Sequence, residues 1–164
     1  MRVRGTLGAL GAGLVVTGCS AIGLNFKDPE VHLNRVIVRA INLSGGALDL
    51  QVAVNNFNSF VINSTKLQLG FDIEDSHVGD IDYENDFQVP KADSTILTLP
   101  VRFNWSGVGA AVRAALGYGD LPYTMKGQIT LDTPFGQKTV PFTREGRAPL
   151  TRVVGVVPAP AGSP

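Results

Sequence analysis

The chain has 164 residues, about one domain, and its 14 basic and 14 acidic side chains give a formal net charge of zero. Such a balance excludes the strongly basic surface by which proteins recruit nucleic acid. The hydrophobic content of 44% is enough for a core. The single cysteine excludes an internal disulfide, so packing and strand hydrogen bonds must supply the stability.

Residues 1–18 are typical of an export signal. Arg2 and Arg4 precede an uncharged, largely apolar run over residues 5–16, which is too short to span a bilayer as a helix. The run ends at Val16-Thr17-Gly18-Cys19, which resembles a lipobox. The resemblance implies cleavage before Cys19, a thioether-linked diacylglyceryl group on its sulfur and an acyl chain such as palmitate on its amine. An ordinary signal peptide, or a free buried cysteine, is the alternative interpretation.

Processing at Cys19 predicts a tethered protein of the cell envelope. Loss of Arg2 and Arg4 would leave 12 basic and 14 acidic residues, a formal charge of −2. Residues 19–28 would form the lipidated tether. Ser20, rather than Asp, follows the cysteine, and in lipoproteins of this kind that implies sorting to the outer membrane, with the body in the periplasm. The covalent lipid is the only bound group we expect.

Most of the remaining sequence alternates apolar and polar residues with a period of two, the pattern of strands with one buried face. The expected strands are residues 31–43, 47–55, 65–74, 96–105, 123–131 and 137–144, the last two joined as a hairpin around Thr133-Pro134-Phe135-Gly136. Pro100 and Pro141 lack an amide donor and should lie at an edge or bulge.

Residues 106–117 break this period. Val108, Ala111, Val112, Ala115 and Leu116 recur at helical spacing, with Ser106 as the expected N-cap and Gly117 as the terminating glycine. The helix should be short and should cover one open end of the fold; the alternative is a helix that dips into a membrane, although Arg113 is its only cation. We therefore predict an all-β domain over residues 29–149, an antiparallel β-sandwich of about seven strands like fibronectin or immunoglobulin domains, with one short α-helix.

Residues 150–164 end in Pro-Ala-Pro-Ala-Gly-Ser-Pro and predict a disordered tail.

The order of these elements and several local sequences resemble the late embryogenesis abundant type 2 family, also described as the water stress and hypersensitive response domain. The resemblance covers roughly residues 29–149. Its most diagnostic part is Asn56-Phe57-Asn58 after a valine-rich strand, where family members typically carry Asn-Pro-Asn. Asparagine side chains bond nearby backbone groups, so we interpret Asn56 and Asn58 as a structural turn rather than a ligand site. The resemblance implies a fibronectin-like sandwich.

The sequence offers little catalytic chemistry. His32 and His77 lie in different expected elements, and neither accompanies a recognisable nucleophile. No HExxH, CxxC or glycine-rich phosphate loop occurs, so we predict that the chain is not an enzyme. Trp105, at the end of a strand, is expected to close the core rather than mark a binding surface.

Acidic residues are concentrated between residues 72 and 86. Asp80, Asp82 and Glu84 alternate and could offer oxygen ligands to Ca²⁺. Asn85 and Lys91 stand where a calcium loop would need glycine and glutamate, so we prefer a solvated strand face and expect no metal site.

Two functions follow. The first is a non-catalytic, monomeric envelope lipoprotein whose module protects membranes or client proteins under water stress, as the family resemblance implies. The second is a periplasmic adaptor or carrier that binds an apolar ligand or an envelope protein. A sealed core favours the first function, and an apolar cavity of several hundred Å³ favours the second.

Overall fold

The computed structural model describes residues 26–117 and 119–153, so the expected signal, lipidation site and distal tail lie outside the described residues. The elements follow the order β1 (Glu30–Ile41), β2 (Gly45–Asn55), β3 (Ile62–Ile73), β4 (Ser76–Tyr83), β5 (Phe87–Val89), β6 (Ser94–Asn104), α1 (Ala110–Ala115), β7 (Asp120–Thr133) and β8 (Gly136–Arg152). Within these described residues, the all-β class and the single short helix are confirmed.

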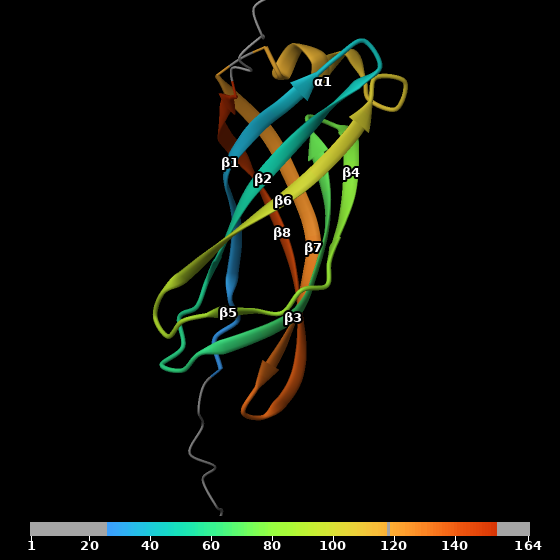
Figure 1. Ribbon diagram of the computed structural model, residues 1–164. Coiled ribbons are helices and arrows are strands. Elements are labelled where there is room, and N and C mark those ends of the chain that lie inside the picture. Colours follow the sequence, from blue (N-terminus) through green and yellow to red (C-terminus); the bar gives the residue numbers. More distant parts are fainter. Residues whose placement is uncertain (1–25, 118, 154–164) are drawn as a thin grey trace, which may run out of the picture.

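The strands form one continuous mixed sheet in the order β4-β3-β7-β8-β1-β2-β6, with β5 paired to the first residues of β3 (Figure 1). Neighbours are antiparallel except β1 and β8, which pair in parallel between Val36–Val38 and Leu150–Arg152. The two ends of the sheet, β4 and β6, pack against each other without pairing. The sheet is therefore rolled into a nearly closed barrel, and the expected purely antiparallel sandwich is corrected in this respect.

Strand length explains the rolled shape. β7 has 14 residues and β8 has 17, and the right-handed twist of such long strands accumulates until a wide sheet curls on itself. Each strand buries alternate side chains, as in β6, where Leu97, Leu99, Val101 and Phe103 point inward. These inward faces enclose one core, with Leu48, Leu50, Phe71 and Met125 among its fully buried side chains.

Pro100 and Pro141 each lie where their strand is paired on one side only. Pro100 is in β6, the last strand of the sheet, opposite Asp49. Pro141 is in β8 opposite Gln128, at a level where β8 is not paired with β1. The predicted hairpin is also present, with Thr133 opposite Gly136, whose φ of 109° requires glycine.

The helix is shorter than the apolar spacing predicts. Its N-cap is Gly109, whose backbone is extended, and its C-cap is Leu116, so Ser106 is not the N-cap. Residues 105–107 instead form a turn, with the amide of Gly107 donating to the carbonyl oxygen of Asn104 at 3.0 Å. Val112, Ala115 and Leu116 are buried, so the stripe does face the core, and α1 covers one end of the barrel (Figure 1).

The packed body extends beyond both expected boundaries. Phe26 packs on the core at the entry of the chain, and Lys138 lies over its ring at 4.6 Å from the centroid. At the other end, β8 continues to Arg152, three residues into the segment expected to be tail. The pairing of Leu150 with Val36 in β1 is non-local, and the local sequence carries no sign of it.

Candidate functional site

The Asn56-Phe57-Asn58 turn lies at the end of the barrel opposite α1, directly after β2 (Figure 1). Asn56 is 1% exposed and Asn58 is 4% exposed. The Asn56 Nδ2 donates to the carbonyl oxygens of Phe60 at 2.8 Å, Val89 at 3.1 Å and Pro90 at 3.0 Å. Its Oδ1 accepts from the Asn58 amide at 2.9 Å, so one side chain joins the β2–β3 and β5–β6 connections.

Asn58 extends this network to the entry of the chain. Its Oδ1 accepts from the Lys27 amide at 2.8 Å, and its Nδ2 donates to the Lys27 carbonyl oxygen at 2.7 Å. Phe57 between the two asparagines is 51% exposed. The asparagines thus have backbone partners for their buried polar atoms, and the arrangement fastens three segments rather than presenting a ligand site.

The acidic side chains of β4 and of Glu84, the residue after it, do not converge on one point. Asp82 and Glu84 share Lys66 of β3, with the Lys66 Nζ at 3.3 Å and 2.8 Å from their oxygens, while Asp80 faces His77. The hydrogen bond to Glu84 raises the pKa of Lys66. Within residues 26–117 and 119–153, no group of three or more His, Cys, Asp or Glu is arranged to hold a metal ion. Ile81 is buried, as a strand face requires.

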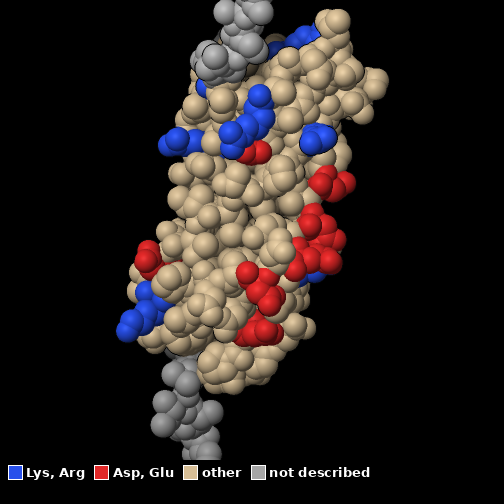
Figure 2. Space-filling view, in the orientation of Figure 1, with Lys and Arg blue, Asp and Glu red and all other residues tan. Residues whose placement is uncertain are grey.

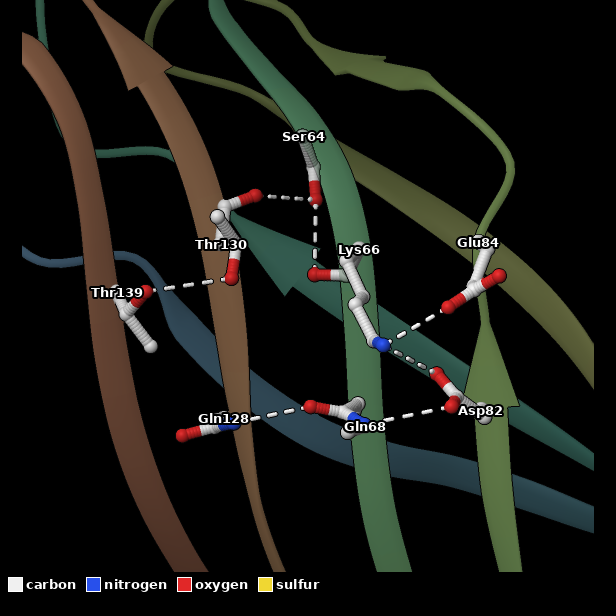
Figure 3. Close-up of polar contacts among 8 residues, drawn as sticks. All are labelled: Ser64, Lys66, Gln68, Asp82, Glu84, Gln128, Thr130 and Thr139. Atoms are coloured by element: carbon white, nitrogen blue, oxygen red, sulfur yellow. Dashed lines mark hydrogen bonds and ion pairs between the residues drawn. The ribbon is translucent and has the colours of Figure 1, made fainter.

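Polar side chains on the outer face of β8, β7, β3 and β4 bond to one another across the strands (Figure 3). The Gln128 Nε2 donates to the Gln68 Oε1 at 2.9 Å, and the Gln68 Nε2 donates to Asp82 at 3.3 Å. We call the six residues of this face the outer ladder: Thr139, Thr130, Gln128, Gln68, Asp82 and Lys66. The ladder satisfies exposed polar groups within the protein.

The two histidines lie apart, in β1 and β4. The His77 Nδ1 lies 2.8 Å from Asp72 and its Nε2 lies 3.3 Å from Asp80, on the exposed face of the sheet. The hydrogen bond to Asp72 is the largest effect on the pKa of His77 and raises it; burial, the next in size, opposes this rise, and the charge and hydrogen bond of Asp80 add smaller increases. Among the described residues, neither ring nitrogen of His77 is hydrogen-bonded to a serine, threonine or cysteine side chain.

A cleft of about 540 Å³ lies beside α1, at the end of the barrel farthest from the chain entry. Its lining extends from buried Val38 and Leu116 to exposed Leu43 and Val153, which are 101% and 49% exposed. Trp105 contributes one wall, and its Nε1 donates to the Asn42 carbonyl oxygen at 2.7 Å. We call this concavity the α1 cleft.

Three arginines line the α1 cleft, and no Asp or Glu of the described residues does. Arg39 pairs with Asp49. Arg113 lies over the Trp105 ring at 4.6 Å from the centroid, and Arg152 donates to the Leu116 carbonyl oxygen at the helix C-terminus. Arg113 and Arg152 form no ion pair with the described residues. Figure 2 shows basic side chains gathered toward this end and acidic ones along the β4 edge.

Sequence reasoning did not single out the arginines of the α1 cleft. Trp105 does pack against the core as expected, but it is only half-buried and also lines the cleft. The one local signal was Leu43, an apolar residue beside Asn42 and Ser44 in a polar turn. Arg39, Arg113 and Arg152 are far apart in sequence, and only the closure of the sheet brings them together.

Taken together, the rolled sheet, the asparagine turn and the covering helix define a small all-β protein with one nearly closed mixed sheet. A family model described as late embryogenesis abundant protein matches residues 51–146, more than half of the chain. The chain belongs to this family, which is the type 2 family that the resemblance identifies.

Solved structures agree with this fold. A protein from Arabidopsis thaliana, known from its solution structure, is 20% identical over 80% of this chain and 87% of its own, with a TM-score of 0.58. A structural-genomics target, named SoR45, is 7% identical over 84% of this chain and 96% of its own, with a TM-score of 0.51. No curated protein matches the chain. None of the described helices is long and apolar enough to cross a membrane.

Proposed function

We propose that the chain is a non-catalytic protective module of the bacterial cell envelope, tethered by a lipid on Cys19 and acting on membranes or client proteins during water stress. The observation that carries the proposal is family membership over residues 51–146. The lipobox-like Val16-Thr17-Gly18-Cys19 supports the anchor, and Ser20 after it supports the outer membrane, facing the periplasm.

The hydrogen bonds of the folded domain suit a protein that acts where little water is available. Among the described residues, no buried side-chain nitrogen or oxygen lacks a hydrogen-bond partner. The outer ladder gives exposed amides, hydroxyls and charges protein partners in place of water (Figure 3). Because such groups lose fewer hydrogen bonds when water is withdrawn, the folded state is less dependent on hydration.

Two measurements test the proposal. Intact mass of the membrane-extracted protein should show a processed, acylated Cys19 species that a Cys19→Ala variant lacks. A strain without the gene should survive drying or osmotic shock less well, and wild type should restore survival better than Cys19→Ala. An unlipidated, soluble product in both samples contradicts the anchor, and unchanged survival contradicts the protective role.

A second function, that of an adaptor or carrier, is favoured by one observation. The α1 cleft has about 540 Å³, within the range of small-molecule sites, and its lining is largely apolar. The core itself is filled by side chains, so a ligand would occupy this cleft rather than the barrel interior. Co-purification of a stoichiometric amphiphile, detected by mass spectrometry of the native protein, would support this function over the first.

A further inference from the structure

We propose that the α1 cleft is a contact site for an anionic lipid surface, in which the exposed apolar side chains enter the headgroup region and the arginines face lipid phosphates. The inference deepens the protective function proposed above, because it names the surface and the chemistry of its partner. It does not depend on lipidation of Cys19.

Several apolar side chains at the α1 cleft are exposed. Leu43 is 101% exposed on the β1–β2 turn, and Ile41 at 48% and Val153 at 49% flank the same cleft. Leu43 thus gains nothing from the packing of its own body and is free to enter another apolar phase. Projecting apolar side chains beside basic ones are what interfacial membrane contact requires.

The α1 cleft also carries positive charge. Arg39, Arg113 and Arg152 line the cleft, and no carboxylate of the described residues does. Arg39 is neutralised by Asp49, and Arg152 uses a donor on the Leu116 carbonyl oxygen, a contact that leaves its charge uncompensated. Arginine offers five N–H donors in a planar fork that matches phosphate, so Arg113 and Arg152 retain donors for an anionic headgroup.

Trp105 adds an aromatic ring to the wall of the α1 cleft. Trp105 joins an apolar ring to an N–H that the Asn42 carbonyl oxygen satisfies at 2.7 Å, and Arg113 lies over that ring. Tryptophan with one wet and one apolar side is favoured at the level of lipid headgroups. A lipid phosphate bound by Arg113 would therefore lie beside the Trp105 ring, and the glycerol and first methylenes of the same lipid would contact that ring.

The opposite end of the barrel provides the matched control. Phe135, in the turn between β7 and β8, is 60% exposed and lies far from the α1 cleft (Figure 1). Lys126, on the outer face of β7, is an exposed cation outside the cleft. Loss of either side chain changes apolar exposure or charge by an amount similar to loss of Leu43 or Arg113.

The experiment uses residues 19–164 carrying Cys19→Ala, so that neither the basic, apolar segment over residues 1–18 nor an acyl group contributes to binding. Vesicles of phosphatidylcholine alone, or with phosphatidylglycerol, are titrated while the emission of Trp105, the single tryptophan, is recorded. Co-sedimentation supplies an independent measure. We expect a blue shift and sedimentation with the anionic vesicles only, both lost at high salt. Arg113→Gln should weaken binding about fivefold and Leu43→Asn severalfold more. Phe135→Ser and Lys126→Gln should leave it unchanged.

Several results would overturn the proposal. These are no binding to anionic vesicles, equal loss in the control variants, or saturation by soluble fatty acid or inorganic phosphate with no preference for vesicles. Dimerisation without lipid that Leu43→Asn abolishes would assign the surface to a second copy of the chain. A failure of vesicle binding would not change the results of the Cys19 mass and survival measurements. Each of the two proposals can therefore be refuted without the other.

Discussion

Replacing Asn56 by alanine removes the side chain that joins the β2–β3 turn to the β5–β6 connection. Three carbonyl oxygens, those of Phe60, Val89 and Pro90, lose their Nδ2 donor, and two Asn58 donors lose the Oδ1 acceptor. The two Nδ2 hydrogens are shared among the three carbonyl oxygens, so about four full hydrogen bonds are lost, and at about 1 kcal/mol net for each they sum to about 4 kcal/mol. Pro90 is exposed and water can replace its partner, so we expect a loss of about 3–4 kcal/mol, a large part of a typical folding free energy.

Urea unfolding followed by far-ultraviolet circular dichroism measures this loss, with an unchanged m-value as evidence that the native state is retained. Asn85→Ala is the control, because Asn85 is exposed and its side chain has no hydrogen bond to the described residues. We expect less than about 0.5 kcal/mol there. Asn56→Asp should cost more as pH rises, since carbonyl oxygens around a buried carboxyl favour its neutral form. Equal stability of the two alanine variants would refute the structural role given to the turn.

Three further outcomes follow from other contacts. Gly127→Ala should destabilise by more than about 2 kcal/mol in urea unfolding, because a Cβ there would lie 2.1 Å from a β3 carbonyl oxygen, whereas Gly119→Ala meets nothing within 4 Å and should be close to neutral. Phe57→Pro should raise the free energy of unfolding by about 0.5–1 kcal/mol, because its exposed position matches the family's proline and proline restricts the unfolded chain; a lower free energy of unfolding would contradict this. Asp72→Asn should lower the pKa of His77 toward its ordinary value in an NMR titration. Because this pKa is raised in the folded state, the stabilisation is present below the unfolded pKa and lost as pH rises through the folded one, so Asp72→Asn should flatten that dependence.

Local patterning predicted the elements well because alternation is set by which face of a strand is buried. The pattern of Leu97, Leu99, Val101 and Phe103 is the same whether the sheet belongs to a sandwich or to a rolled barrel. Strand partners are decided by contacts between distant segments, such as Val36 with Leu150, so the parallel β1–β8 pair that joins the sheet was beyond prediction.

The asparagine turn could be predicted from the sequence and the α1 cleft could not, because the turn depends on local contacts and the cleft on distant ones. Asn56 and Asn58 act over two residues of chain, and their local hydrogen-bonding tendency is a property of the residue type. Arg39, Arg113 and Arg152 belong to β1, α1 and β8 and meet only after closure of the barrel. The helix was located from its apolar stripe, but its first turn was displaced by three residues because the turn after β6 occupies Ser106 and Gly107.

The geometry of the body constrains how its two proposed lipid contacts combine. The 17 residues of β8 span roughly 56 Å at about 3.3 Å each, and the chain enters at the end opposite α1 (Figure 1). Because Phe26 and Lys27 are held by the body, only residues 19–25 could act as the tether, and they reach at most about 25 Å, so an upright body anchored at Cys19 keeps the α1 cleft away from its own bilayer. Lying flat on the β4 edge would place Asp80, Asp82 and Glu84 against anionic lipid, which like-charge repulsion opposes. If both proposals hold, the favoured arrangement is end-on, with the anchor in one lipid surface and the α1 cleft facing another.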